Sequence, residues 1–376
     1  MTRIAIVGAG IIGAATADRL SRAGADVTLV DAQQPGHGAS GTSLAWLNSS
    51  NKPPRDYHDL SVRGIEEWRR LAADLDDPAW YVPTGSIAWT DTDEGRTELT
   101  GRVARLRDWE YPATELTLAA LADLEPELRL PADAHAAFFP AEGFLHGGEA
   151  VQALVARARA GGAAVVTGSP VTTVETDGTE VTGLGLADGR RITADAYVFC
   201  AGVATPALLA GVGVTVALLP GDAPQSPAPC LVGHVTTGSH LISRVVQSAG
   251  LSMRPLSSPG LFPEAGLYLE AGDVNAGVDV HIEPAAKDRY VAELLARATA
   301  VLPALHGQQP ATGRVCVRPL PTDGMPIVGW LPSLGNGYLI VTHSGMTLGA
   351  LLGRLAAAEL LGATEAVLGP YRPTRF

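Results

Sequence analysis

The stretch at residues 4–13 constrains the fold of this chain more than any other. Ile4 to Val7 form an uninterrupted apolar run, as in a strand that is buried on both faces inside a parallel sheet. Glycines follow at positions 8, 10 and 13. In such a strand-turn-helix the first glycine makes a tight turn, the second lets the backbone approach a diphosphate, and the third lets the helix pack on the strand. The sequence therefore predicts a dinucleotide-binding turn, with the diphosphate at the helix N-terminus.

The residues that follow support this prediction. A GxGxxG string alone would be weak evidence, because it can occur by chance in a chain with 43 glycines. Apolar residues at helical spacing lead to Gly24, a helix stop, and a second apolar strand at 27–30 ends in Asp31. Asp31 lies 18 residues after Gly13 (31 − 13), close to the spacing of the acid that binds a ribose hydroxyl. An acid here argues against the 2′-phosphate of NADP.

Length and charge limit the domain number and the partners. With 376 residues the chain exceeds the usual size of one core, so two domains are expected. A net charge of −12 without a basic cluster argues against nucleic acid and an anionic membrane as partners. Gly or Pro interrupts every long apolar run, so no membrane span is expected. The three cysteines have no paired spacing and no secretory signal is evident, which indicates a cytoplasmic protein without a metal site.

The rest of the chain alternates helical and extended patterns. Glycine-rich residues 36–43 are expected to form an irregular loop that can lie against a flat ligand, and residues 215–235 a crossing loop. A last strand, loop and helix at 338–361 form a second arrangement like a phosphate loop. Other helices are expected near 56–75, 94–109, 117–125, 147–160 and 287–302, and other strands at 85–89, within 163–200, and at 243–247, 266–270 and 278–282.

Four segments together resemble the D-amino-acid oxidase (DAO) family of FAD enzymes, which includes glycine oxidase and sarcosine oxidase. They are the N-terminal fingerprint with Asp31, the loop at 38–46, the strand end at 198–202, and the tail that joins Arg318-Pro319-x-Pro321-x-Asp323-Gly324 to His343-Ser344-Gly345. The resemblance implies an α/β protein: a discontinuous, Rossmann-like FAD-binding domain with an antiparallel β-sheet substrate domain. The expected ranges are 1–80, 146–215 and 310–376 for FAD binding, and 81–145 and 216–309 for the substrate.

The resemblance also implies cofactor contacts. Gly8, Gly10 and Gly13 would hold the pyrophosphate, Asp31 the adenosine ribose, and the backbone from Gly345 to Leu348 would face the flavin N1–C2=O edge. A helix N-terminus there would stabilise the negative charge of reduced flavin. The remaining expected cofactor positions are Ile12, Ala32, Ala39, Ser40, Leu44, Ala45, Trp46, Val171, Ala201, Gly202, Met346 and Thr347.

On the substrate side, Arg318 aligns with the arginine that grips the substrate carboxylate in this family, a role suited to a bidentate guanidinium. A surface or interdomain salt bridge is the alternative, and Arg254 competes for the carboxylate. Tyr268 lies where some relatives have a substrate-site tyrosine, and a core or sheet-edge role is equally compatible with its position.

Two further features bear on the flavin. Cys316 has the spacing of the cysteine that holds flavin covalently in sarcosine oxidases, but its coexistence with Arg318 favours a buried strand cysteine and non-covalent FAD. The histidine that binds flavin in dimethylglycine dehydrogenases corresponds to Ala45. Lys52 or His343 could supply positive charge that speeds the reaction with O2, although each could equally be an ordinary loop residue.

The resemblance therefore implies an FAD-dependent oxidase of a small amine, most simply an amino acid, that passes hydride from the α-carbon to flavin N5 and reduces O2 to H2O2. The alternatives are an FAD dehydrogenase or a tailoring oxidase of a secondary or cyclic amine in specialised metabolism. An NAD-dependent dehydrogenase and a non-catalytic flavin-binding scaffold are the competing functions of other classes. The substrate, its chirality and the oligomeric state are not predicted.

Overall fold

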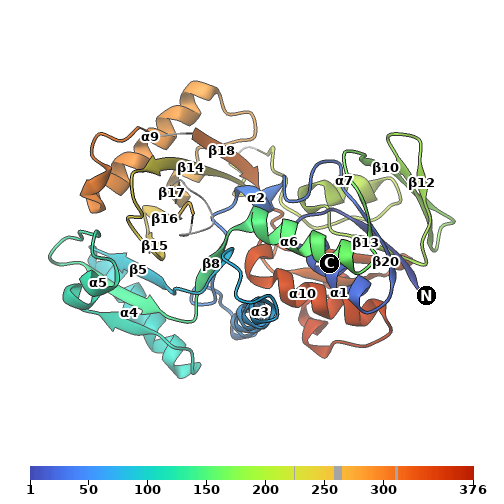
Figure 1. Ribbon diagram of the computed structural model, residues 1–376, viewed down its shortest axis with the longest axis horizontal. Helices are drawn as coiled ribbons and strands as arrows, with labels where there is room; N and C mark the ends of the chain where they lie inside the picture. The colour runs from blue at the N-terminus through green and yellow to red at the C-terminus, as the bar shows by residue number, and fades with distance from the viewer. Residues whose placement is uncertain (224, 258–264, 310–311) are drawn as a thin grey trace. The chain divides into compact units, whose positions relative to one another are not determined.

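The computed structural model describes residues 1–223, 225–257, 265–309 and 312–376 (Figure 1). The chain forms two compact units, and each is built from segments that are distant in the sequence. Unit 1 comprises Met1–Gly41, Gly147–Gly221 and Val317–Phe376, and unit 2 comprises Thr42–His146 and Asp222–Cys316. No helix in the described ranges is both long and apolar enough to cross a lipid bilayer.

Unit 1 is organised around a largely parallel sheet. Among the described residues its strand order is β19 (Ile327–Leu331), β20 (Leu334–Val341), β13 (Ala196–Phe199), β1 (Arg3–Val7), β2 (Asp26–Val30) and β9 (Ala164–Val166). Strand β1 lies at the centre, where Ile6 is opposite Leu29 on β2 and Val198 on β13, both parallel. Residues 4–7 are all buried, as the apolar run predicts. Only β19 is antiparallel to its neighbour among these described pairs.

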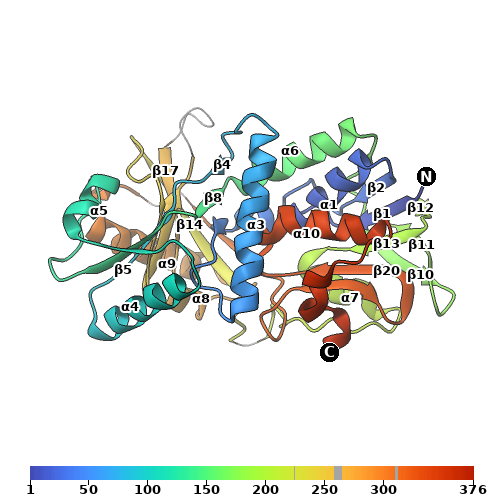
Figure 2. The same cartoon turned by 90° about the horizontal axis from the view of Figure 1, so that it is seen from below.

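Layers cover both faces of this sheet. Helices α1 (Ile11–Arg22), α6 (Gly147–Ala160) and α10 (Gly345–Leu360) pack together on one face (Figure 2). A β-carbon added to Gly353 of α10 would lie 2.7 Å from that of Ala15 in α1, so the two helices cross closely. The other face packs against α7 (Thr205–Ala210) and a small antiparallel sheet of β10 (Val171–Thr176), β11 (Val181–Leu186) and β12 (Arg191–Ile192).

Short helical turns complete unit 1. They are η1 (Gly202–Ala204), η3 (Ala366–Tyr371) and η4 (Pro373–Arg375). A further helical turn, α2 (Ala39–Thr42), lies in the stretch 36–43 that the sequence predicts to be irregular, so that prediction is wrong for these four residues. Its small side chains permit a single turn because they place no bulky group against the neighbouring backbone.

Unit 2 is organised around a mainly antiparallel sheet. Among the described residues its strand order is β18 (Thr312–Val317), β14 (Pro229–Thr237), β17 (Ala265–Glu270), β16 (Leu251–Pro255), β15 (Val245–Ser248), β5 (Ser86–Thr90), β7 (His135–Phe139) and β6 (Thr114–Leu116). Strands β15 and β5 run parallel, and the pairs from β14 to β16 and from β5 to β6 run antiparallel. The predicted antiparallel sheet is thus confirmed.

The two faces of this sheet differ. Helix α9 (Pro284–Val301) packs against one face, through Leu231, Leu267 and Leu269 (Figure 1). The opposite face carries Cys230 and Tyr268, and at its β5–β7 end α4 (Asp93–Asp108) packs on it. Shorter elements of this unit are α5 (Leu118–Leu124), α8 (Gly272–Asn275) and η2 (Pro303–Leu305).

Residues 42–80 group with unit 2, whereas the expected ranges include them in the FAD-binding domain. The reason is a third small sheet in which β8 (Gly143–Leu145) pairs with both β3 (Trp46–Leu47) and β4 (Tyr81–Val82). Helix α3 (Arg55–Ala73) belongs to the same unit and matches its predicted range closely. The other expected boundaries, near 215 and 310, lie a few residues before those of the structure, at 221 and 316.

Two predictions in the second half of the chain are wrong. Val278–Ile282 forms turns after α8, although both apolar side chains pack on the core, which is why their spacing resembles a strand. Residues 215–235 were expected to form a crossing loop, but strand β14 begins within them at Pro229. The sheet accommodates the proline and glycine residues of this strand.

Candidate functional site

The turn between β1 and α1 depends on glycine. Gly8 has a φ of +108°, and a β-carbon there would lie 2.5 Å from the carbonyl oxygen of Cys200 on the neighbouring strand. A β-carbon on Gly13 would overlap the carbonyl oxygen of Gly8. Gly8 N–H donates to Val30 O at 2.8 Å, which joins the turn to β2. The turn therefore has the geometry in which backbone N–H groups at a helix N-terminus can bind a diphosphate.

Ser40 stands at this helix N-terminus. Its Oγ accepts a hydrogen bond from Ile11 N–H at 3.0 Å. A β-carbon on Gly10 would come within 3.2 Å of the same Oγ, so the approach to the turn is narrow. Ile12 is buried in the first turn of α1, whereas Ala39 is half-buried beside Ser40.

Asp31, at the end of β2, is tied to the same turn. One carboxylate oxygen accepts from Ala9 N–H at 2.6 Å and the other from Gln33 N–H at 2.8 Å. The carboxylate is thus fixed next to the glycine turn, with Ala32 exposed beside it. On the other side of β1, Ala201 touches the position of the missing Gly8 β-carbon and Gly202 has a φ of +58°.

A second helix N-terminus meets the first. A β-carbon on Gly345, the first residue of α10, would lie 3.4 Å from the Ile11 side chain. Gly147 packs against Ser40 O and Met346. A β-carbon added to Gly147 would lie 3.2 Å from the Met346 side chain. Thr347 and Leu348 are buried behind them. The positive ends of two helix dipoles therefore lie on one side of unit 1, an environment that favours negative charge.

Arg318 and His343 also belong to unit 1. Arg318 precedes a segment that pairs with residues 217–219, where Leu219 N–H donates to Leu320 O at 2.9 Å. His343 lies just before α10, with its Nε2 3.3 Å from Ser344 Oγ. Val171, the first residue of β10, packs against the core beneath the parallel sheet.

In unit 2 the loop at 44–50 is held in an unusual conformation. Ala45 has a φ of +53°, which lies in the left-handed region that residues other than glycine rarely adopt. The guanidinium of Arg254, which is 2 % exposed, donates from Nε to Leu44 O, and Leu145 N–H donates to Ala45 O at 3.0 Å. The indole Nε1 of Trp46 donates to Glu142 at 3.1 Å.

Tyr268 lies in a row of side chains across three strands. It is opposite His234 on β14 and Arg254 on β16. The Arg254 guanidinium lies 4.0 Å from the centre of the Tyr268 ring, and His234 meets that ring edge-on at 4.4 Å. Burial, and then the charges of Arg314 and Arg254, lower the pKa of His234 to about 4, so the imidazole is neutral at pH 7. Because β17 is an inner strand, Tyr268 is not at a sheet edge.

Lys52 and Cys316, which the sequence analysis relates to the flavin, also belong to unit 2. Lys52 places its ammonium 5.4 Å from the centre of the Tyr57 ring, a cation–π contact. Cys316 is buried with Cys230 and Val232 and packs near Tyr268, in agreement with the expected buried strand cysteine.

The comparisons with known proteins decide the family. The model of the DAO family, described as FAD dependent oxidoreductases, matches residues 3–359. This chain belongs to that family. The expected α/β fold and the FAD cofactor are thereby confirmed, and the chain is an FAD-dependent oxidoreductase of the DAO type.

Relatives are similar over nearly their whole length. The chain is 26 % identical to a glycine oxidase of Geobacillus kaustophilus, covering 99 % of this chain and 96 % of the relative. It is 25 % identical to an N-methyl-L-tryptophan oxidase of Escherichia coli, covering 99 % and 98 %. The fold matches the crystal structure of the Geobacillus kaustophilus glycine oxidase with a TM-score of 0.85, at 23 % identity and full coverage of both chains.

The residues of unit 1 fit FAD. The Gly8–Gly13 turn fits the diphosphate, because glycines at both ends let the backbone pack closely where added β-carbons would meet Cys200 O and Gly8 O. The two helix N-termini would supply positive dipole ends for the anionic parts of the cofactor. In this DAO-family chain the other predicted site residues belong to unit 1, whereas Leu44, Ala45, Trp46, Lys52 and Tyr268 belong to unit 2.

Glu142 and Arg254 hold the 44–50 loop, and sequence reasoning did not assign them this task. Trp46 and its partner Glu142 are 96 residues apart, and Leu44 and Arg254 are 210 apart. The one signal for Glu142 is that an acid stands alone in the apolar run Phe138-Phe139-Pro140-Ala141-Glu142-Gly143-Phe144. Such an acid is buried only when donors surround it.

Proposed function

We propose that this enzyme oxidises a small amine, most simply an amino acid, and reduces O2 to H2O2. The observation that carries the proposal is Arg318, which lies in the unit with the FAD-binding turn and matches the family position that grips a carboxylate. The named relatives act on glycine and on N-methyl-L-tryptophan, which are both α-amino acids. Bound FAD would supply the two-electron acceptor, taking hydride from the α-carbon at N5 and returning both electrons to O2.

The remaining steps fall to the chain and to water. The Arg318 guanidinium would bind the substrate carboxylate through two parallel N–H···O bonds and so fix the position of the α-carbon hydrogen. With a neutral substrate amine, loss of hydride gives an iminium that releases one proton and is hydrolysed to an oxo acid and ammonia or an amine. No protein base is needed to remove a proton from carbon. The start of α10, from Gly345 to Leu348, would stabilise the negative charge that develops at the cofactor.

The other proposed roles follow the family positions. Lys52 or His343 would supply the positive charge that favours reaction with O2, and Tyr268 would lie at the substrate. The cofactor contacts proposed in unit 1 are those of Gly8, Gly10, Ile12, Gly13, Asp31, Ala32, Ala39, Ser40, Val171, Ala201, Gly202, Gly345, Met346, Thr347 and Leu348. Leu44, Ala45 and Trp46 of unit 2 are proposed to contact the ring system of non-covalently bound FAD.

The carboxylate role of Arg318 is tested by comparing substrates. Arg318→Ala should raise KM by about 100-fold or more for amino acids, because a charge-assisted bidentate pair is lost, and by less than about threefold for the matching decarboxylated amines. Arg318→Lys, which keeps the charge but not the fork, should fall in between. Equal changes for amino acids and amines would refute the role.

A second candidate is the oxidation of a secondary amine, favoured by the relative whose substrate carries an N-methyl group. A panel of primary, N-methylated and cyclic amino acids in an oxygen electrode separates the two candidates by their relative kcat/KM. The same assay distinguishes an oxidase from a dehydrogenase, since an oxidase produces H2O2 without an added electron acceptor.

A further inference from the structure

We propose that Glu142 is a positioning residue that fixes the 44–50 loop, and with it Trp46, for contact with the flavin. The inference rests on the proposed contacts of Leu44, Ala45 and Trp46 with FAD. It assigns to unit 2 a buried carboxylate that shapes the ring-binding surface without touching substrate.

The Glu142 carboxylate accepts hydrogen bonds from two segments, the 44–50 loop and strand β5. Its Oε1 accepts from the backbone N–H groups of Ser49 at 2.8 Å and Ser50 at 2.7 Å. Its Oε2 accepts from Trp46 Nε1 at 3.1 Å and from Ser86 Oγ at 2.5 Å. The residue is 1 % exposed, so water competes little with these bonds. One carboxylate therefore determines both the path of the loop and the direction of the indole.

Glu142 is itself fixed by the backbone on both sides. Its N–H donates to Phe139 O at 3.2 Å, and its carbonyl accepts from Gly85 N–H at 2.9 Å. The next residues form β8, where Phe144 is paired with Trp46. These bonds hold the Glu142 carboxylate against β3, the strand that carries the Trp46 indole. A side chain that only filled space would not need such a fixed position.

The loop has a conformational cost that these bonds offset. Ala45 is in the left-handed region, which is unfavourable for a residue with a side chain. Two other side chains help: Arg254 donates to Leu44 O, and His58 Nδ1 donates to Ser49 O at 2.8 Å. Burial lowers the pKa of His58, so it donates as a neutral imidazole.

The hydrogen-bond chemistry specifies an acid at 142. Two donors converge on each oxygen, and a carboxylate has only acceptors. In Glu142→Gln one oxygen can still accept from Ser49 and Ser50, but the amide NH2 then faces the N–H of Trp46. The substitution keeps the size and shape of the side chain and disturbs the indole in particular.

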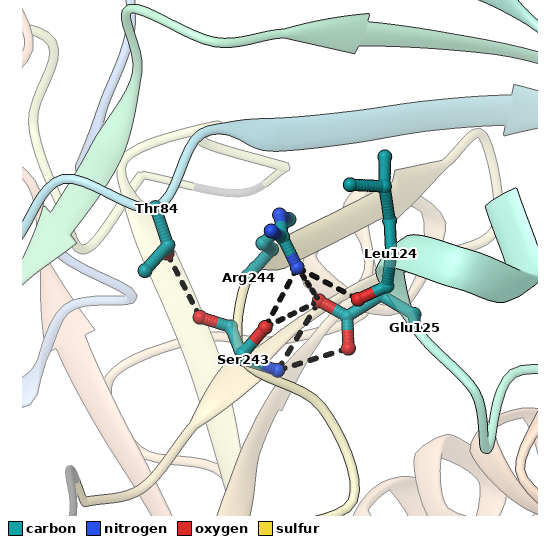
Figure 3. A network of polar contacts seen from close by, with 5 residues as sticks. All are labelled: Thr84, Leu124, Glu125, Ser243 and Arg244. Carbon is teal, nitrogen blue, oxygen red and sulfur yellow. Dashed lines mark hydrogen bonds and ion pairs between the residues drawn. The ribbon is translucent and has the colours of Figure 1, made fainter. Parts of the chain in front are cut away.

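Glu125 supplies a matched control in the same unit. It is also 1 % exposed and accepts from Ser243 N–H, Ser243 Oγ and Arg244 Nη1, at 3.0, 2.9 and 3.1 Å (Figure 3). These partners join α5 to the start of β15 and include no residue of the 44–50 loop. Glu125→Gln therefore makes the same chemical change at a comparable buried site elsewhere.

The experiment measures FAD binding and the visible circular dichroism of the bound flavin in full-length wild type and both Gln variants. Glu142→Gln should weaken FAD about tenfold, which corresponds to one lost hydrogen bond to a charged group, and should change the flavin dichroism. Glu125→Gln should leave both unchanged within twofold. Wild-type values in Glu142→Gln, or equal changes in the two variants, would overturn the proposal.

If Glu142→Gln does not fold, Glu142→Asp decides. It keeps the charge and all the acceptors but withdraws them by one methylene, so it should weaken FAD and change the dichroism in the same direction. Wild-type values in a folded Asp variant would overturn the proposal. None of these measurements needs a substrate, so failure of every amine to be oxidised would count against the proposed function and not against the role of Glu142.

Discussion

Gly13 has no room for a β-carbon, because the carbonyl oxygen of Gly8 occupies the place of one. Gly13→Ala should therefore push α1 away from the turn and lower the free energy of unfolding by about 1–3 kcal/mol, with a loss of FAD affinity. Thermal unfolding and FAD titration measure the two effects.

Gly148 provides the control for this change. It lies in the first turn of α6, and a β-carbon there would meet no atom within 4 Å. Gly148→Ala should leave FAD binding unchanged and stabilise the protein by up to about 1 kcal/mol, through the helix propensity of alanine. A stability loss in Gly148→Ala as large as that in Gly13→Ala would contradict the steric explanation.

At single residues, the sequence predicted what depends on neighbours along the chain. The requirements at Gly8 and Gly13, and the acid at the end of β2, follow from local backbone geometry and spacing. The tasks of Glu142 and Arg254 could not be predicted, because their partners in the 44–50 loop are 92 to 210 residues away and only folding brings them together. A buried charge is recognised through its partners, and these are not visible in a local sequence.

Among the elements, α10 is fixed at its C-terminal end by a buried network. The Glu359 carboxylate accepts from Tyr338 Oη at 2.7 Å and from Arg372 Nη1 at 2.7 Å, and its side chain is 3 % exposed. Glu359→Gln removes the charge and leaves Arg372 without its carboxylate, so it should cost about 3 kcal/mol in the free energy of unfolding. Denaturant unfolding checks this value.

Glu293, paired with Arg297 on the surface of α9, is the matched control. Glu293→Gln should cost less than about 0.5 kcal/mol, because exposed pairs contribute little. A cost comparable to that of Glu359→Gln would show that the buried network has no special role.

The same network has a pH dependence of known sign. Burial alone would raise the pKa of Glu359, but the bonds from Arg372 and Tyr338 outweigh burial, and the pKa lies below the ordinary value of 4.5. The stability from the ionised group is therefore present above pH 4.5 and lost as the pH falls through the folded-state pKa. The stability difference between wild type and Glu359→Gln should shrink as the pH falls below 4.5; a difference that grows there would contradict this sign.

Elements with a strong period were predicted well and irregular ones were not. Helices α3, α4 and α9 match because their apolar residues recur at helical spacing over four turns or more. Val278–Ile282 was predicted as a strand because its apolar residues alternate, but they face the core from a turn. In so short a segment the apolar pattern does not distinguish a strand from a turn.

For the whole molecule, the two halves of FAD should contribute differently to stability. Unit 1 contains the turn and Asp31 proposed to hold the ADP half, so FAD at 100 times its Kd should stabilise the apoprotein by about 2.7 kcal/mol. FMN lacks the AMP part of FAD, which is the adenosine and one of the two phosphates, and should shift the thermal midpoint far less at the same concentration. Equal shifts for FMN and FAD, measured by thermal unfolding, would show that the AMP part is not bound by unit 1.

The division into units shows the limit of sequence reasoning at this scale. Its general form, two interleaved units with a parallel and an antiparallel sheet, was predicted from four motifs in family order. The position of residues 42–80 was not, because it depends on β3 pairing with β8 and on the bonds to Glu142. Those contacts cross about 90 residues of intervening chain, over which no local pattern extends.

The strand order of unit 1 also dictates when this protein can mature during its synthesis. Strand β1 is made first, yet its neighbour β13 begins at residue 196 and the partner of β13, β20, begins at residue 334. At about 5–20 residues per second, the ribosome needs roughly 10–40 s after β1 to make β13 and roughly 20–70 s after β1 to make the start of α10. The helix terminus at Gly345 is therefore translated long after the other parts of the proposed FAD site, and stable capture of the cofactor must await synthesis of α10.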